Sequence, residues 1–351
     1  MSSPSLATAT KTETLMFAEA AEGGDAVQRF LTHNRAAIRK LGEHLRAHPP
    51  LFVTTCARGS SDHAATFGKY LIETLLGVQV SSAALSTSSI YAAPVVARQS
   101  LCIAISQSGR SPDLLTAVEA HKRGGAYVVA LVNDEDSPLA ALADSLLALK
   151  AGPEKSVAAT KSYITSLAGL AAIVATWAQD DALSHALETL PEQLKKAFAL
   201  DWSAALADLK PARNLFVIGR GYGFGVAQEA ALKLKETCAL HAEAFSAAEV
   251  RHGPMAIVGD GFPVLAFATS DTAGDGVREV AVEFAERGAH VLLAGADPAA
   301  GATHLPALVS HAAVEPILMI QSFYRLANTL SLARGLNPDH PPHLNKVTKT
   351  V

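Results

Sequence analysis

The sequence predicts an α/β protein with two doubly wound parallel sheets, each flavodoxin-like and flanked by helices. Short apolar runs alternate with stretches of helical periodicity along most of the 351 residues, a pattern typical of successive βαβ units. The alternation pauses in one long helical stretch and then restarts. An apolar run that leads into an Arg-Gly turn occurs in both halves, at 56–59 and at 218–221. We therefore expect a degenerate internal repeat and two related domains.

The first half is predicted to open with helices over 16–48. These break at Gly23-Gly24 and end before Pro49-Pro50, because neither residue type favours a helix interior. Apolar runs then predict strands at 51–56, 79–84, 101–105, 127–132 and 145–149. Helical periodicity predicts helices at 62–76, 87–93, 112–123, 137–143 and 159–178.

The second half follows a linking helix that is predicted over 182–209, with a break near Pro191. Its predicted strands are 213–218, 263–268 and 290–294, and its predicted helices are 226–237 and 314–335. The expected organisation is therefore an N-terminal segment, a first domain, a linking helix with a second domain, and a tail, at 1–48, 49–180, 181–336 and 337–351. We expect residues 1–15 to be disordered or loosely attached.

Composition excludes several classes of protein. A hydrophobic content of 49% suffices for two cores, and a net charge of −4 argues against nucleic-acid binding. No apolar run reaches the length of a membrane span, and the polar N-terminus lacks a signal core. Three cysteines, Cys56, Cys102 and Cys238, lie in or beside apolar runs without metal-ligand spacing. We therefore expect a cytoplasmic protein with reduced thiols, no metal, and no nucleic-acid or membrane partner.

A nucleotide cofactor is not expected either. The turn at 219–223 reads Gly-Arg-Gly-Tyr-Gly, which lacks the GxGxxG spacing of a dinucleotide site, and no acidic residue stands out at the end of a following strand.

Two hydroxyl-rich turns each join an apolar run to a helical stretch. The first turn contains Ser60 and Ser61, and the second turn contains Ser106, Gln107, Ser108 and Ser111. Backbone N–H groups at a helix start, together with hydroxyls, can hold a phosphate dianion. Simple helix capping is the alternative for one such turn, but two turns in one sheet favour a ligand crevice at a topological switch point.

The charges beside these turns leave questions open. We expect no fixed negative charge in the second turn until Asp113, placed well inside the following helix. Arg58 and Arg110 flank the turns, and the sequence leaves open whether they attract a phosphate or point to solvent.

Groups suited to proton transfer occur in the second half. Glu229, Lys233 and Glu236 are spaced to share one helix face. A surface salt-bridge ladder is the alternative, but the neighbouring Ala, Leu and Cys residues favour a partly buried face, where a glutamate near a lysine can act as a base. His252 precedes Gly-Pro at the end of an element, a position that favours a functional histidine.

Two further segments are weaker candidates. The polar loop at 155–162 could bring the backbone N–H groups of Val157 and Ala158 to a ligand, although helix capping would explain it equally well. The C-terminal tail has apolar anchors after a Pro-rich bend and could fold back to deliver Lys346.

Six motifs, in order, resemble the sugar isomerase (SIS) family. They are CARGSSDHA, ISQSGRSPD, KSVAATKS, EAALKLKETCALHAEAF, EVRHGP and LNKVTKTV. The likeness runs from about residue 16 to the end. Within the family, the chain resembles the isomerase half of glucosamine-6-phosphate synthase. Arg-Ser-Pro at 110–112, where the synthase has Glu-Thr-Ala, resembles most closely the SIS-type glucosamine-6-phosphate deaminases. The resemblance implies two tandem SIS domains.

The resemblance also implies roles for individual residues. Glu236 would transfer a proton between C1 and C2 with Lys233 beside it, and His252 would open the sugar ring from the neighbouring subunit of a homodimer. Lys346 matches a lysine that contacts the sugar or forms a Schiff base. The sugar hydroxyls would meet the backbone of Val157 and Ala158, and Ala159 replaces a serine of the synthase. The phosphate would bind Ser61, Ser106, Gln107, Ser108 and Ser111, with Ser60 beside it.

The expected activity is conversion of glucosamine 6-phosphate to fructose 6-phosphate and ammonia, without cofactor or metal. Synthesis is less expected because no glutaminase domain with an N-terminal cysteine precedes the first motif. An aldose–ketose isomerase or an ammonia-dependent synthase remains the alternative. A non-catalytic phosphosugar sensor is a third reading, disfavoured because no basic DNA-binding module is visible. The sequence leaves glucosamine and galactosamine 6-phosphate unseparated.

Overall fold

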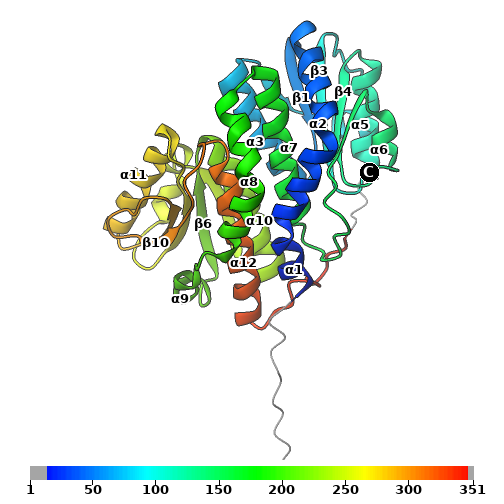
Figure 1. Cartoon of the computed structure of the whole chain (residues 1–351). Helices are drawn as coiled ribbons and strands as arrows, with labels where there is room; N and C mark the ends of the chain where they lie inside the picture. The colour runs from blue at the N-terminus through cyan, green and yellow to red at the C-terminus, as the bar shows by residue number, and fades with distance from the viewer. Residues whose placement is uncertain (1–13, 347–351) are drawn as a thin grey trace, which may run out of the picture.

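The computed structural model describes residues 14–346. Within them lie two parallel sheets of five strands, set apart in Figure 1. In sequence order, both sheets have their strands arranged second, first, third, fourth, fifth. The α/β class and the internal repeat are therefore confirmed. The first sheet contains β1 (Phe52–Cys56), β2 (Val80–Ser82), β3 (Ser100–Ser106), β4 (Tyr127–Val132) and β5 (Ser145–Ala148). The second contains β6 (Asn214–Gly219), β7 (His241–Ser246), β8 (Pro263–Phe267), β9 (His290–Gly295) and β10 (Thr303–Pro306).

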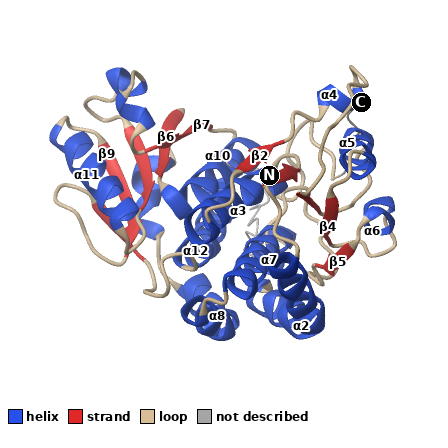
Figure 2. Ribbon diagram, turned by 90° about the horizontal axis from the view of Figure 1, so that it is seen from above, coloured by secondary structure: helices blue, strands red, loops and turns tan. Residues whose placement is uncertain are grey.

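A central group of helices lies between the two sheets (Figure 2). The helices of the first half are α1 (Leu15–Ala21), α2 (Gly23–Ala47), α3 (Ser60–Leu76), α4 (Ser86–Ser89), α5 (Pro112–Arg123), α6 (Pro138–Leu142) and α7 (Lys161–Ala178). They are followed by α8 (Asp181–Ala199), α9 (Leu206–Leu209), α10 (Phe224–Cys238), α11 (Thr272–Glu286) and α12 (Glu315–Ala333). Short 3-10 turns occur at Ser203–Ala205, Gly221–Gly223, Glu249–Arg251 and Pro254–Ile257.

Some predicted elements are wrong. The helix over 182–209 ends at Ala199, and it does not break at Pro191, which lies inside α8. Buried leucines on both sides of the proline, Leu187 and Leu194 among them, hold this helix in the core. The helix predicted over 87–93 shrinks to α4, whose Ser-Thr-Ser-Ser sequence has no apolar stripe. Within the segment 1–15 that was expected to be disordered or loosely attached, residues 1–13 lie outside the described residues, whereas Thr14 caps α1 and Leu15 begins it.

The two helices that join the domains approach each other closely. At Gly225, near the start of α10, an added Cβ would lie 2.5 Å from the carbonyl oxygen of His63 on α3. The Tyr163 hydroxyl donates to the Gly225 carbonyl at 3.1 Å. A glycine is therefore needed where α10 meets the first domain.

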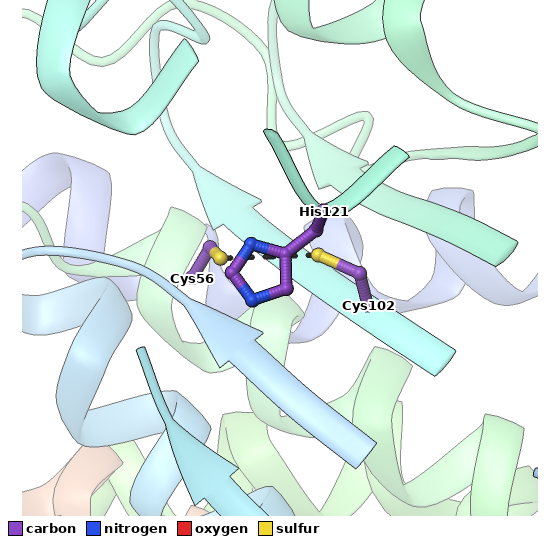
Figure 3. A group of neighbouring side chains, drawn as sticks. All are labelled: Cys56, Cys102 and His121. Carbon is purple, nitrogen blue, oxygen red and sulfur yellow. Dashed lines mark hydrogen bonds between the residues drawn. The ribbon is translucent and has the colours of Figure 1, made fainter. Parts of the chain in front are cut away.

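Cys56 of β1, Cys102 of β3 and His121 of α5 form a buried cluster (Figure 3). The two sulfur atoms are 3.8 Å apart and both thiols are free, as is that of Cys238. The neighbouring Cys56 thiol and burial raise the pKa of Cys102 well above its ordinary value. Spacing along the chain gave no hint of this group, because the adjacent strands β1 and β3 and the helix α5 bring it together. Among the described helices, none has the length and apolar character to cross a membrane.

Candidate active site

A cleft of about 340 Å³ lies at the carboxyl ends of β1 and β3. These strands are neighbours, while β2 lies on the other side of β1, so the cleft occupies the topological switch point of the first sheet. Its walls come from the two hydroxyl-rich turns, the loop before α7, helix α10 and the C-terminal segment. The cleft therefore collects residues from both halves of the chain.

Most predicted site residues line this cleft. They are Ser60, Ser61, Ser106, Gln107, Ser108, Ser111, Val157, Lys233, Glu236 and Lys346. Ala158 is not among the lining residues and is 2% exposed, whereas its neighbour Ala159 does line the cleft. His252 is exposed at the end of the Glu249–Arg251 turn and does not line the cleft of its own chain.

Side-chain capping of the helices does not explain the two turns. The N-cap position of α3 is Gly59, which has no side chain, and Ser111 at the N-cap position of α5 makes no side-chain cap hydrogen bond. The Ser106 hydroxyl accepts the Gly109 backbone N–H at 2.9 Å. Gly109 has a φ of +64°, and an added Cβ would lie 2.3 Å from the Ser137 hydroxyl oxygen. The second turn is thus tightly shaped, with the Ser111 hydroxyl not used for capping.

Lys233 is the centre of the proton-transfer group. Its side chain is 1% exposed and its ammonium lies 3.3 Å from Glu229 Oε1 and in contact with Glu236 Oε2. It also donates to the Ser60 hydroxyl at 3.2 Å. Glu229 is fully buried and Glu236 is 22% exposed at the cleft. The alternative of a surface salt-bridge ladder is therefore wrong.

Electrostatics keep Glu229 and Lys233 charged. Burial alone would raise the pKa of Glu229, but Lys233 and then His63 outweigh burial and hold the pKa below its ordinary value. Burial alone would lower the pKa of Lys233, but Glu229 and Glu236 raise it above its ordinary value. One buried ammonium therefore faces two glutamates.

A second layer of polar residues supports Glu229. His63 on α3 lies 3.1 Å from Glu229 Oε2 through its Nδ1, and the Tyr324 hydroxyl on α12 donates to Glu229 Oε1 at 3.1 Å. Burial, with Glu229 nearby, raises the pKa of Tyr324 well above its ordinary value, so the phenol stays a neutral donor. The sequence analysis missed both residues, because they come from distant helices without a shared motif.

Lys346 reaches the cleft from the C-terminal segment. Its ammonium donates to the Ser156 carbonyl at 2.7 Å and to Glu154 Oε2 at 3.3 Å. Glu154 is buried and accepts the backbone N–H groups of Thr160 and Ser162, at 2.9 and 3.2 Å. Glu154, one residue before the KSVAATKS motif, was missed as well. Residues 347–351 of the last motif lie outside the described residues.

One prediction for the loop before α7 needs correction. The Val157 backbone N–H donates to the Asp339 carbonyl at 3.4 Å, so this N–H contacts the C-terminal segment instead of facing a free ligand site. The reason is that the segment after α12 packs against the loop.

Asp113 differs from the expectation, and the two arginines, whose places the sequence left open, are placed differently from each other. Asp113 lies in the first turn of α5 and not deep inside it, because the helix begins at Pro112. Arg58 lines the cleft, whereas Arg110 is absent from the lining and pairs with Asp134 at 2.7 Å.

Comparisons with known proteins agree with this geometry. A family model described as the SIS domain matches residues 53–176 and 208–300. The isomerizing glutamine–fructose-6-phosphate aminotransferase of Symbiobacterium thermophilum is 35% identical over 311 residues, covering 84% of this chain and 51% of that protein. The protein of that name from Thermococcus kodakarensis is 34% identical over 346 residues, covering 94% of this chain and 57% of the relative. The chain thus spans about half the length of the curated relatives it matches.

Solved structures share the fold over nearly the whole chain. A candidate phosphosugar isomerase of Silicibacter pomeroyi is 43% identical, with a TM-score of 0.89, covering 93% of this chain and 100% of that one. The glucosamine-6-phosphate deaminase of Thermotoga maritima has a TM-score of 0.76 at 24% identity, covering 96% of this chain and 100% of that one, which is a likeness of fold. With family matches in both sheets and relatives similar over most of its length, the chain belongs to the SIS domain family.

Proposed function

We propose that the chain is an enzyme, a glucosamine-6-phosphate deaminase that acts in the cytoplasm and releases fructose 6-phosphate and ammonia. The observation that carries the proposal is the placement of Glu236. Its carboxylate is at the cleft, beside the buried Lys233, and the hydroxyl-rich turns form the facing wall. A base and a phosphate cradle in one cleft fit a phosphorylated sugar whose C1–C2 bond lies near the base.

The proposed reaction starts with ring opening. The phosphate group lies against Ser61, Ser106, Gln107, Ser108 and Ser111, with Ser60 beside it. A histidine moves the proton between O5 and O1. His252 suits this role only from a neighbouring subunit, because it is exposed and does not line the cleft of its own chain. We therefore propose a homodimer with shared active sites.

Proton transfer follows on the open-chain aldehyde. Glu236 removes the proton from C2 while O1 takes up a proton from water, which gives a 1,2-enolamine. Glu236 then returns its proton to C1 as the nitrogen releases a proton to water. The product is an imine at C2, which water hydrolyses to the ketone and ammonia. Lys233 stays charged beside Glu236 during the transfer, because Glu229 and Glu236 raise its pKa. Lys346 contacts the sugar from the C-terminal segment, and Val157, which lines the cleft, borders the sugar.

Arg110-Ser111-Pro112 supports deamination over synthesis, since this triplet departs from the synthase pattern. The second candidate is a phosphosugar aldose–ketose isomerase or an ammonia-dependent synthase. The names of the curated relatives favour it, and the same base serves both chemistries.

An assay with glucosamine 6-phosphate tests the proposal. Ammonia and fructose 6-phosphate are followed together, with the wild-type chain, Glu236→Gln, and Glu188→Gln as an exposed control. Equal release of both products, lost in Glu236→Gln and kept in the control, is the expected result. Isomerisation without ammonia would replace the deaminase with the isomerase. Release from galactosamine 6-phosphate alone would correct the substrate, and binding without any turnover would leave a sensor.

A further inference from the structure

We propose that the ion pair of Arg58 and Asp113 is the charged part of the phosphate subsite. Arg58 binds a phosphate oxygen of the substrate at the rim of the cleft, and Asp113 is a positioning residue that fixes the guanidinium. This inference deepens the proposed function and rests on its phosphorylated substrate class.

The geometry of the pair holds Arg58 at the cleft. Its Nε and Nη2 donate to Asp113 Oδ2, at 2.9 and 2.8 Å. The other carboxylate oxygen of Asp113 accepts the Leu114 backbone N–H at 2.8 Å. The Asp113 side chain is 1% exposed, while that of Arg58 is 54% exposed and lines the cleft. A carboxylate anchored in the protein thus holds a guanidinium whose outer edge faces solvent.

Arg58 keeps donors for a ligand. A guanidinium has five N–H donors in a fixed plane, and the bonds to Asp113 use the Nε and Nη2 edge. Among the described residues, no hydrogen bond engages Nη1 of Arg58. A guanidinium held in place by a carboxylate loses little freedom when it binds a phosphate oxygen, and such charge-assisted bonds are stronger than neutral ones.

The charges in the cleft leave this task to Arg58. A phosphate monoester carries about −1.5 to −2 charges at neutral pH. The hydroxyl-rich turns that would hold it offer neutral groups. Besides Arg58, the described cations that line the cleft are Lys233 and Lys346, and each is held by glutamates. Arg58 is the described cation that belongs to a hydroxyl-rich turn and lines the cleft.

The negative charge of Asp113 lies close to the place proposed for the phosphate. It lies in the first turn of α5, where the positive end of the helix dipole would favour a phosphate. A carboxylate at that place repels a dianion, and the Arg58 guanidinium offsets this repulsion. Loss of Arg58 should therefore remove a cationic donor and also leave the Asp113 carboxylate with one positive neighbour fewer, and neutralising Asp113 should recover part of the loss.

The chain offers a matched control. Arg110 belongs to the second turn, is 51% exposed, and donates to Asp134 Oδ2 through Nε and Nη2 at 3.1 and 2.7 Å. It makes the same kind of paired contact but does not line the cleft.

The first experiment titrates inorganic phosphate into the wild-type chain, Arg58→Gln and Arg110→Gln by calorimetry. We expect Arg58→Gln to weaken phosphate binding by about tenfold or more, and Arg110→Gln to bind as the wild type does. With glucosamine 6-phosphate, Arg58→Gln should raise KM far more than it lowers kcat. Equal phosphate affinity of Arg58→Gln and the wild type would overturn the inference, as would an equal loss in Arg110→Gln.

A double variant keeps the test decisive if Arg58→Gln folds poorly. Arg58→Gln/Asp113→Asn removes the buried charge together with its partner, and it should bind phosphate better than Arg58→Gln and less well than the wild type. Wild-type affinity in the double variant would overturn the role of Arg58. If phosphate binding depends on Arg58 but the wild type turns over no sugar, the deaminase proposal is rejected and this inference stands. If Arg58→Gln keeps both normal turnover and the phosphate affinity of the wild type, this inference alone is rejected.

Discussion

The ammonium of Lys233 donates a hydrogen bond to the hydroxyl of Ser60 at 3.2 Å. This contact joins α10 of the second half to the first hydroxyl-rich turn of the first half. Because Lys233 also touches Glu229 and Glu236, one buried cation connects the proposed base with the proposed phosphate cradle. The link between base and cradle explains why stability and activity should respond together to changes at this lysine.

Lys233→Met should destabilise the chain strongly. Removing the ammonium leaves Glu229 fully buried without its cation, a change that costs about 3–5 kcal/mol when a buried pair is broken. Urea unfolding measures the free energy. Lys195→Met is the control, since Lys195 forms exposed pairs with Asp25 and Glu192, and exposed pairs contribute little. Similar losses in both variants would contradict the assignment of a buried charge centre.

The stability of the chain should fall in acid through Glu229. Its pKa in the folded state lies below the ordinary value of 4.5, so the unfolded state binds a proton first as the pH falls. The stabilisation is therefore fully present above about pH 4.5 and is lost as the pH drops through the lowered pKa. Urea midpoints measured across this range should fall less steeply for Glu229→Gln. Parallel curves for both proteins would show that another carboxylate dominates.

The stability that Lys233 contributes should be lost in alkali, whereas that of Glu229 is lost in acid. Its folded-state pKa is raised above 10.5, so its contribution is present below that pH and is lost as the pH rises through the raised pKa. In urea unfolding at high pH, the wild type should lose stability that Lys233→Met has already lost. If the free energies of unfolding of the wild type and Lys233→Met differ by the same amount up to the most alkaline pH, the prediction is wrong.

Lys346→Met should lower activity more than stability. The lysine is 25% exposed and holds the C-terminal segment to Ser156 and Glu154. Its loss frees the segment from the cleft, so kcat/KM should fall by about tenfold or more, while thermal unfolding shifts little. Lys196→Met, at an exposed position of α8, is the comparison. A large shift in the unfolding temperature with normal kcat/KM would assign Lys346 a purely structural role.

The thiols should react slowly in the native chain. Cys56, Cys102 and Cys238 are all buried, and burial raises the pKa of Cys238 to about 11. A thiolate is the reactive form, so a disulfide reagent should modify all three only after unfolding in urea. Rapid modification of the folded chain would show that the β1–β3 region opens.

Sequence reasoning predicted the architecture where patterns are local and strong. Apolar central strands, turn glycines and helix faces such as Glu229–Lys233–Glu236 carry their own signal. The edge strands β7 and β10 were missed because polar residues interrupt their apolar pattern. Among these, His241 and Glu243 are exposed and His304 is half-buried. Helix α11 was missed because Gly274 and Gly276 weaken its helical pattern.

The limits at the site have the same origin. Residues on one motif, such as Ser106 and Ser108, were found together. His63, Tyr324 and Glu154 act through contacts across long sequence distances, and no periodicity reports such contacts. The places of Arg58 and Arg110 differ for the same reason, since their partners Asp113 and Asp134 come from different elements.

The close approach at Gly225 limits how far α10, which carries the proposed base, can lie from the first half of the chain. At Gly225 a hydrogen atom occupies the space where a methyl group would meet the His63 carbonyl. The spacing of the two halves therefore depends on a residue that takes no part in the proposed reaction. A methyl group there would act as a wedge under α10 and carry Lys233 and Glu236 away from the turns of the first half. Selection for turnover must therefore extend to a position that never meets the sugar, and a variant there could look like an active-site mutant in every kinetic assay.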